Sequence, residues 1–168
     1  MMFAKPISSP MSASFPLSKF DGSTITDPSL YRSTIGSLQY LSLTRPDLSF
    51  SVNKVSQFMQ EPRDTHWTAV KHILRYLKFT SDHTFSIYHS SSHSLTAYSD
   101  SDWAGCPDDR RSTSGYCTFL GRNLLSWISK KQPTMSRSST ESEYKALANA
   151  SSELVWIQAL LCELGQRF

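Results

Sequence analysis

The sequence has little of what marks secreted, membrane-spanning or nucleotide-binding chains. It contains no run of about 20 apolar residues, the length that crosses a bilayer, and residues 1–19 lack the apolar stretch of a secretory signal. No glycine-rich phosphate loop is present. The cysteines, Cys106, Cys117 and Cys162, are too few and too far apart for a disulfide framework or a paired zinc knuckle. We therefore expect a soluble intracellular protein with buried thiols and no membrane partner.

Composition and charge describe a folded protein with a mildly basic surface. Hydrophobic residues make up 39% and aromatic residues 12% of the chain, as in folded rather than disordered proteins. At 168 residues the chain can form one domain of average size or two small ones. The net charge of +3 favours a polyanionic partner only slightly, because it lies in the range of ordinary soluble domains.

The chain divides into three parts on its proline content and hydrophobic period. Residues 1–27 combine prolines with many serines and have no sustained period, so we expect a loosely ordered tail. Residues 28–82 have a helical period, whereas residues 83–168 have first a strand period and then a long helical one. The expected fold class is α+β, with a helical segment, a three-stranded antiparallel meander and a long C-terminal helix.

Three helices are expected between residues 28 and 82, each with one apolar stripe. The first begins near Ser29, the second at Asp47 and the third at Asp64, and prolines separate them. Residues three and four apart share a helix face, so the stripes should pack together. The stripes are Tyr31, Ile35, Leu38 and Leu41; Leu48, Val52, Val55 and Met59; and Trp67, Val70, Leu74 and Leu77.

Alternation with a period of two predicts strands from Phe85 onward. Phe85 and Ile87 alternate with polar residues. Three further alternating segments, separated by turn-forming residues, form the expected meander at residues 95–100, 116–120 and 124–128. A long helix should then run from about Ser139 to Leu164, where Gly165 stops it.

Asp100 and Asp102 are the first candidate site residues, because both lie at the end of an expected strand. Residues two apart share one strand face, so the two carboxylates should lie side by side. Such a pair repels unless a cation or hydrogen-bond donors intervene, and an oxygen-only ligand set suits Mg2+ better than zinc. The alternative is that both residues begin a solvated turn, where aspartate is common.

Glu143 is the second candidate, near the start of the long helix. Steps of four and three residues along the apolar stripe of that helix lead back to Glu143, whereas Glu141 lies about 200° around the helix and can serve the cap with Ser138. We therefore expect Glu143 to face inward, where a carboxylate is costly unless it is paired, ligates a metal or borders a site. The alternative is that helix initiation alone explains both glutamates. The stripe is Leu147, Ala150, Leu154, Ile157 and Leu161.

Basic and hydroxyl-bearing residues flank the second and third strands. Side chains of these types are the usual phosphate contacts, and loops at one end of a small sheet could align them along a nucleic-acid backbone. A solvated surface is the alternative. The candidates are Arg110, Arg111, Ser112, Thr113, Lys130 and Lys131.

Four ordered motifs occupy the second half of the chain: residues 97–105 (AYSDSDWAG), 109–116 (DRRSTSGY), 126–127 (SW) with 130–132 (KKQ), and 138–144 (SSTESEY). Together they resemble the ribonuclease H module of copia-type retrotransposons. The first half is similar to the segment that joins reverse transcriptase to ribonuclease H in the same Pol polyprotein. Its motifs lie at residues 27–32, 36–41 (GSLQYL), 44–47 (TRPD) and 75–78 (RYLK). By this resemblance, residues 28–82 are the reverse transcriptase connection segment and residues 83–168 are a partial ribonuclease H-like domain.

The resemblance implies an enzyme that cuts the RNA strand of an RNA:DNA hybrid with two Mg2+ ions. Asp100 would be the first metal-binding carboxylate and Glu143 the second, with Asp102 as a neighbour. Two ions activate the attacking water and stabilise the leaving oxygen, and the protein reads the hybrid through groove shape and 2′-hydroxyls. The implied partners are the hybrid and the remaining reverse transcriptase and ribonuclease H. The implied location is cytoplasmic particles, or an organelle if the element entered an organellar genome.

Two parts of that family's pattern are missing from the sequence. In the family, a strand after the long helix carries a third essential aspartate, but no residue after Glu163 is acidic here, and the polymerase's own Asp-Asp pair is absent. We therefore expect an incomplete ribonuclease H-like fold that is inactive alone. An unpaired edge on its first strand should promote self-association. The alternative is a non-catalytic relic that binds nucleic acid weakly.

Overall fold

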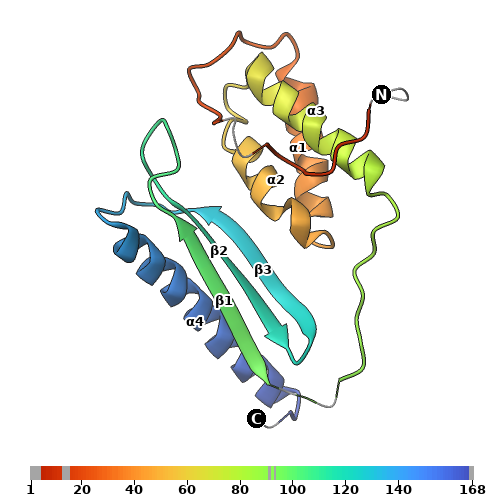
Figure 1. Cartoon of the computed structure of the whole chain (residues 1–168), viewed down its shortest axis with the longest axis vertical. Helices are drawn as coiled ribbons and strands as arrows, with labels where there is room; N and C mark the ends of the chain where they lie inside the picture. The colour runs from red at the N-terminus through yellow and green to blue at the C-terminus, as the bar shows by residue number, and fades with distance from the viewer. Residues whose placement is uncertain (1–4, 13–15, 91, 93, 167–168) are drawn as a thin grey trace. The chain divides into compact units, whose positions relative to one another are not determined.

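The chain forms two compact units in the computed structural model, which describes residues 5–12, 16–90, 92 and 94–166. The helical unit extends to Phe85 and includes Cys106–Asp108, and the sheet unit comprises Ser86–Gly105 and the residues from Asp109 onward. Helices build the first unit, and a three-stranded sheet with one long helix builds the second (Figure 1). The expected α+β class and the order of its elements are confirmed.

An aspartate cap and a proline set where the first helix of the helical unit begins. The unit contains α1 (Pro28–Leu41), the 3-10 helix η1 (Pro46–Leu48), α2 (Ser49–Ser56) and α3 (Asp64–Phe79). The Asp27 carboxylate accepts hydrogen bonds from the backbone N–H groups of Ser29 and Leu30, each at 3.0 Å. Pro28 suits the first helical position, because the N–H that proline lacks would have no partner inside the helix.

The core of the helical unit contains the apolar residues that the helical period predicts for its first two helices. Because these residues recur at spacings of three and four, each helix turns one apolar face toward the others. Those buried as expected are Tyr31, Ile35 and Leu38 of α1, Leu48 of η1, and Val52 and Val55 of α2.

The stripe predicted for α3 is wrong by one position. Val70 is buried as expected, but Trp67, Leu74 and Leu77 are only partly buried. The fully or nearly fully buried residues are instead His66, Ile73 and Tyr76. Two of these side chains have polar tips that are hydrogen-bonded inside the unit, so a pattern of apolar residues does not detect them.

An ion pair of the buried Arg45 joins the connection after α1 to the end of α3. Arg45 donates from Nε and Nη2 to the two carboxylate oxygens of Asp47, at 2.9 and 2.7 Å, and from Nη1 to the Thr80 carbonyl at 3.0 Å. The Tyr76 hydroxyl donates to the same carboxylate at 2.8 Å. Hydrogen bonds from Arg45 lower the pKa of the Asp47 carboxyl, which stays ionised in this partly buried place.

The segment before α1 is anchored to the helical unit at several points, which its composition did not predict. Leu17 is buried in the core, and Thr24 pairs with Arg63 in an isolated antiparallel bridge. His66 holds the Ser18 carbonyl 2.9 Å from its Nε2, and residues 1–4 and 13–15 of the expected tail lie outside the described residues.

The sheet unit is the antiparallel meander expected from the strand period. Its strands are β1 (Leu95–Asp102), β2 (Thr113–Leu120) and β3 (Asn123–Lys131), in the order β1-β2-β3, and the helix α4 spans Ser139–Glu163. The strands are longer than predicted at the end where Asp102 pairs with Thr113 and Thr113 pairs with Lys131. Pairing with a neighbouring strand extends them through residues that have no alternating pattern.

The strand predicted at Phe85 and Ile87 does not form, because the chain from Asp82 to His89 has no ladder partner among the described residues. Instead, the side chain of Asn123 binds both backbone groups of Tyr88. Its amide oxygen accepts from the Tyr88 N–H at 2.7 Å, and its amide nitrogen donates to the Tyr88 carbonyl at 2.8 Å. One amide side chain therefore holds this segment in an extended form without a sheet.

Buried thiols and the lack of a membrane-spanning segment were the remaining expectations. Cys106 is buried and Cys117 is partly buried, but Cys162 near the end of α4 is exposed, so the expectation of three buried thiols is wrong for Cys162. Among the described residues, no helix has the length and apolar character to cross a membrane.

Candidate functional site

The candidate site residues of the sheet unit gather at one end of the sheet, where β1 ends, β2 starts, β3 ends and α4 begins (Figure 1). We call it the carboxylate end. Antiparallel pairing aligns Asp102 with Thr113 and Thr113 with Lys131. The start of α4 joins them, because the hydroxyl oxygens of Ser101 and Ser142 lie 2.5 Å apart. Residues that are far apart in sequence thus meet through strand register and one helix contact.

Asp100 and Asp102 share one face of β1, as predicted, and both are exposed. That face is opposite α4, because the intervening Ser101 points toward the helix. The two carboxylates differ in their surroundings. The Asp102 carboxylate accepts a hydrogen bond from the Thr113 N–H across the strand pair, whereas the Asp100 carboxylate makes no hydrogen bond or ion pair with any described residue. Asp102 therefore has a structural role, and Asp100 is available to a ligand.

Glu143 is exposed, so the expectation that it faces inward is wrong. The residues of α4 that pack against the sheet are Ser142, Ala146, Ala150 and Ile157. Small side chains at the first three positions let α4 approach β1 and β2 closely, and a pattern based on large apolar residues misses them. Glu143 lies about 100° around the helix from Ser142, at the border of the contact face. Like that of Asp100, its carboxylate makes no hydrogen bond or ion pair with any described residue.

Glu141 serves the start of α4, as predicted. The Glu141 N–H donates to the Ser138 hydroxyl at 3.1 Å, and its carboxylate accepts from the Arg137 N–H at 2.8 Å and pairs with Lys145 at 2.8 Å. These bonds lower the pKa of Glu141, chiefly through Lys145. Its carboxylate is therefore occupied, in contrast to that of Glu143.

A buried polar network centred on Gln132 connects the sheet to α4. Gln132 is 3% exposed, and its amide nitrogen donates to the Ser114 hydroxyl at 2.7 Å and the Ser142 carbonyl at 3.0 Å. Its amide oxygen accepts from the Ser136 hydroxyl at 2.8 Å. Sequence reasoning placed Gln132 in a basic motif and missed this role. The sequence feature that could have indicated this role is a neutral amide directly after the two lysines that end a strand.

The basic candidates divide into exposed and paired side chains. Arg110 and Lys130 are exposed. Arg111 and Lys131 converge on the Asp109 carboxylate, with nitrogen–oxygen distances of 3.5 and 2.8 Å. Arg110 has a positive φ of 56°, uncommon for a side chain other than glycine. The turn before β2 thus presents basic groups at the carboxylate end.

Ser112 and Thr113 are buried, which corrects the expectation that their hydroxyls contact phosphate. Ser112 has no exposed surface, and its hydroxyl accepts a hydrogen bond from the Ala104 N–H at 3.0 Å. Thr113 is 7% exposed and pairs with Asp102 and Lys131. These residues shape the β1–β2 connection instead, where Ala104 has a positive φ of 55°.

The oxygen donors at the carboxylate end suit Mg2+ in kind but not in number. Asp100 and Glu143 are exposed carboxylates without partners, and hard divalent cations prefer such ligands. Within the described part of the chain, however, no three His, Cys, Asp or Glu side chains cluster closely enough to hold a metal ion. Asp100 and Glu143 are therefore too few to make such a cluster by themselves.

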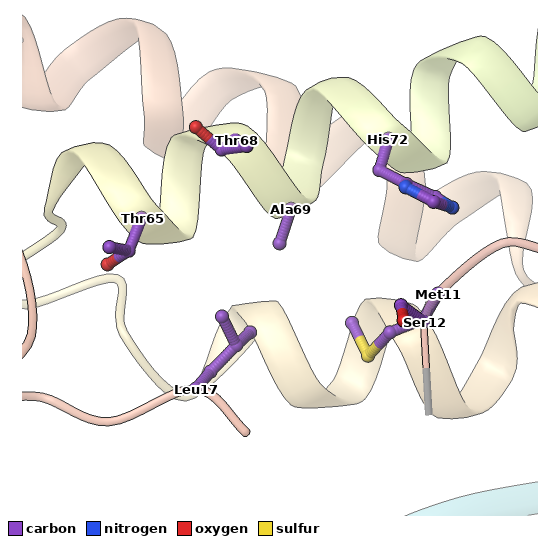
Figure 2. A pocket seen from close by; sticks show the side chains of 7 residues that line it. All are labelled: Met11, Ser12, Leu17, Thr65, Thr68, Ala69 and His72. Carbon is purple, nitrogen blue, oxygen red and sulfur yellow. The ribbon is translucent and has the colours of Figure 1, made fainter. Parts of the chain in front are cut away.

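A separate apolar pocket of about 220 Å3 lies in the helical unit, between α3 and the segment before α1. Figure 2 shows Met11 and Leu17 of that segment facing Ala69 and His72 of α3. Nε2 of His72 lies 3.0 Å from the Ser9 carbonyl oxygen, so the ring is already hydrogen-bonded. We assign the pocket no function.

Comparison with known proteins shows relatives along nearly the whole chain. It is 53% identical over 165 residues to the retrovirus-related Pol polyprotein from transposon RE2 of Arabidopsis thaliana, a match that covers 98% of this chain. It is also 50% identical over 163 residues to an uncharacterized mitochondrial protein of the same plant, of which it covers 66%. A secreted RxLR effector protein of Plasmopara viticola is 47% identical over 128 residues, which are 90% of that protein and 76% of this chain. The chain is homologous to copia-type retrotransposon Pol polyproteins over nearly its whole length.

The chain spans a small part of the length of the Pol polyproteins that it matches. The match covers 11% of the RE2 polyprotein. No family model matches the chain, and no solved structure matches it. Most of the length of such a Pol polyprotein therefore lies outside the matched stretch.

Proposed function

We propose that this chain is part of an RNA:DNA-hybrid ribonuclease H module, to which Asp100 and Glu143 supply two metal-binding carboxylates. One observation carries the proposal. Two exposed carboxylates without partners flank the contact between Ser101 and Ser142, so β1 and α4 bring them to the same end of one sheet. Asp102, Asp109 and Glu141, the other acidic residues there, are hydrogen-bonded or ion-paired.

The chemistry of the site supports a magnesium cofactor. Unpaired exposed carboxylates repel each other, and a bound cation removes that repulsion. When two Mg2+ ions are bound, they activate a water molecule and stabilise the oxygen that leaves the phosphodiester. Because Asp100 and Glu143 are a partial set, the proposal is that further ligands come from elsewhere in the Pol polyprotein and that this chain alone is inactive.

The proposed substrate contact at the carboxylate end is electrostatic. Arg110, Arg111, Lys130 and Lys131 lie in the turn before β2 and at the end of β3, next to the proposed metal ligands. Cationic side chains bind the phosphates of a nucleic acid whatever its sequence. Their role is to position the hybrid across the carboxylates, while groove shape distinguishes the hybrid from DNA.

The helical unit has a different proposed role, as the connection between reverse transcriptase and ribonuclease H. Its Arg45–Asp47 ion pair lies in the TRPD motif that carries this resemblance. The Arg45 side chain is buried, so separation of the pair would leave its charge without an ionised partner, and this favours one backbone geometry. The unit is proposed to support the module rather than to contact the scissile strand.

The test is cleavage of a labelled RNA:DNA hybrid in Mg2+ by this chain, alone and mixed with the segment that follows the matched region in a relative's Pol polyprotein. We expect no cutting by the chain alone, cutting by the mixture, and loss of cutting with Asp100→Asn or Glu143→Gln. Glu163→Gln, which changes an exposed glutamate at the far end of α4, is the matched control and should cut normally.

Two outcomes would contradict the proposal. Equal cutting by the mixture with and without Asp100→Asn and Glu143→Gln would show that these carboxylates bind no catalytic metal. Cutting by the chain alone that both substitutions abolish would show that the ligand set is complete.

A second candidate function is that of a non-catalytic relic with weak nucleic-acid binding. The observation that favours it is that no cluster of three metal-ligating side chains occurs in the described residues. No cutting by the mixture, together with salt-sensitive binding of the hybrid, would support this function over the first.

A further inference from the structure

Trp103 is an exposed aromatic residue whose orientation is fixed by a hydrogen bond. It follows β1 directly, and its indole Nε1–H donates to the Ser136 carbonyl at 3.0 Å. Even so, 50% of its surface is exposed. Tryptophan that only fills space is usually buried to a greater extent, so the exposed half of this ring has no explanation in the packing of the sheet unit.

The bond to Ser136 connects the ring to the network at the carboxylate end. The Ser136 hydroxyl donates to Gln132, whose amide nitrogen binds both Ser114 of β2 and Ser142 of α4. The position of the indole therefore depends on the same contacts that join β1 to α4. A side chain fixed before binding loses little conformational entropy when a ligand arrives.

We propose that the exposed face of Trp103 contacts a sugar of the nucleic-acid strand that lies across Asp100 and Glu143. This inference rests on the proposed function and adds a binding residue that the motifs did not assign. The only polar atom of the ring is already bonded to Ser136, so the exposed face can offer apolar and π contact but no hydrogen bond. Such a contact suits a sugar in a wide, shallow minor groove and does not depend on base sequence.

The charges around Trp103 fit a nucleic-acid strand. Trp103 is one residue beyond Asp102, whose carboxylate binds Thr113 at the start of β2, and Arg110 and Arg111 precede Thr113 in the turn. Along the chain, Trp103 therefore lies between Asp100, proposed to hold metal, and the two arginines proposed to hold phosphate. A sugar joins consecutive phosphates along a strand, so a ring that lies near both kinds of group suits contact with a sugar.

The experiment measures binding of the full chain to a fluorescently labelled RNA:DNA hybrid by anisotropy, without Mg2+ so that no cleavage occurs. Trp103→Phe keeps an aromatic ring but loses the N–H bond, and Trp103→Leu loses the ring. Trp156→Leu is the matched control, because Trp156 is also an exposed tryptophan of the sheet unit, 60% exposed on α4. Thermal unfolding of each variant reports whether the fold is retained.

We expect Trp103→Leu to weaken hybrid binding about 5- to 20-fold, the size of one aromatic contact with a nucleic acid. Trp103→Phe should stay within about twofold of the unsubstituted chain because the ring is retained, and Trp156→Leu should bind normally. The Arg110→Glu and Arg111→Glu double variant tests the proposed function separately, because it removes phosphate contacts and leaves the ring in place.

The outcomes distinguish this inference from the proposed function. Equal binding by Trp103→Leu and the unsubstituted chain, with weakened binding by the arginine variant, would overturn the ring contact and leave the proposed function intact. Equal weakening by Trp103→Phe and Trp103→Leu would also overturn it, because the N–H anchor and not the ring would then matter. Absence of hybrid binding by the unsubstituted chain would overturn both.

Discussion

The hydroxyl oxygens of Ser101 on β1 and Ser142 on α4 lie 2.5 Å apart, and each serine is the sequence neighbour of a candidate carboxylate. Asp100 precedes Ser101, and Glu143 follows Ser142. The serine pair therefore sets how far apart the backbone positions of the two carboxylates are. A larger side chain at either serine would push α4 away from β1 and change that separation.

Replacement of Gln132 should destabilise the sheet unit. Gln132→Leu removes one hydrogen bond each from the Ser114 hydroxyl, the Ser142 carbonyl and the Ser136 hydroxyl. The loss of hydrogen bonds by buried polar groups costs roughly 1–3 kcal/mol, so we expect the free energy of unfolding in urea to fall by about that amount. Lys130→Leu, two residues earlier and exposed, is the control and should change it by less than about 0.5 kcal/mol. Equal stability of Gln132→Leu and the unsubstituted chain would show that the network contributes nothing.

Removal of the Asp47 charge should destabilise the helical unit. Asp47→Asn leaves Arg45, whose side chain is 10% exposed, without its ionised partner. Since the Asp47 side chain is 34% exposed, solvent reduces the effect, and we expect a loss of roughly 1–3 kcal/mol in the free energy of unfolding. Asp82→Asn, an exposed aspartate of the same unit, should have no measurable effect. A matching loss in both variants would contradict the role of the pair.

The same carboxyl predicts a pH dependence in the acid range. The pKa of Asp47 is lowered in the folded protein, chiefly by hydrogen bonds from Arg45, so the folded state binds its proton less readily than the unfolded chain does. This stabilisation is fully present above the ordinary carboxyl pKa of about 3.9 and is lost as pH falls below it. Urea unfolding at a series of acidic pH values should show a steeper loss of stability for the unsubstituted chain than for Asp47→Asn.

His66 predicts a second pH dependence, nearer neutrality. Burial lowers the pKa of His66, and the positive charge of Arg63 lowers it further, while the bond to Ser18 and the charges of Asp108 and Asp21 oppose the shift. Its Nδ1 accepts from the Arg63 N–H at 3.0 Å, so the neutral ring fits the site. The stabilisation is present above the ordinary histidine pKa of about 6.5 and is lost as pH falls below it.

The measurement is the free energy of unfolding between pH 7.5 and 5 for the unsubstituted chain, His66→Gln and His89→Gln. We expect the loss of stability on acidification to be smaller in His66→Gln, because the group that must take up a proton is absent. His89 is exposed, and its substitution should leave the pH dependence unchanged. A curve for His66→Gln parallel to that of the unsubstituted chain would contradict the assignment.

The outer edge of β1 should make the isolated chain associate. β2 pairs with one side of β1, and no described strand pairs with the other side. Open strand edges template pairing with further chains, and charge on the edge strand suppresses it. We therefore expect oligomers whose population rises with protein concentration in sedimentation velocity, and fewer of them for Tyr98→Lys, which adds charge to an exposed position of β1.

Leu147→Lys is the control that tests whether association occurs through the exposed apolar side chains of α4 instead of the strand edge. Leu147 is 52% exposed on that helix. It should associate like the unsubstituted chain. Monomers at every concentration would refute the prediction, and monomers for Leu147→Lys alone would assign association to α4 instead.

The sequence by itself determined the type and order of the elements, the cap of α4 and the residues that meet at the carboxylate end. Its helical and strand periods predict which long apolar side chains are buried, and these residues lie in α1, α2 and the meander. Only the tertiary structure decided that Ser142 rather than Glu143 faces the sheet, that Ser112 is buried and that Gln132 joins β2 to α4. The physical reason is that β1 and α4 approach each other through small and hydrogen-bonding side chains. Their burial depends on partners from distant strands, which no hydrophobic period along the chain records.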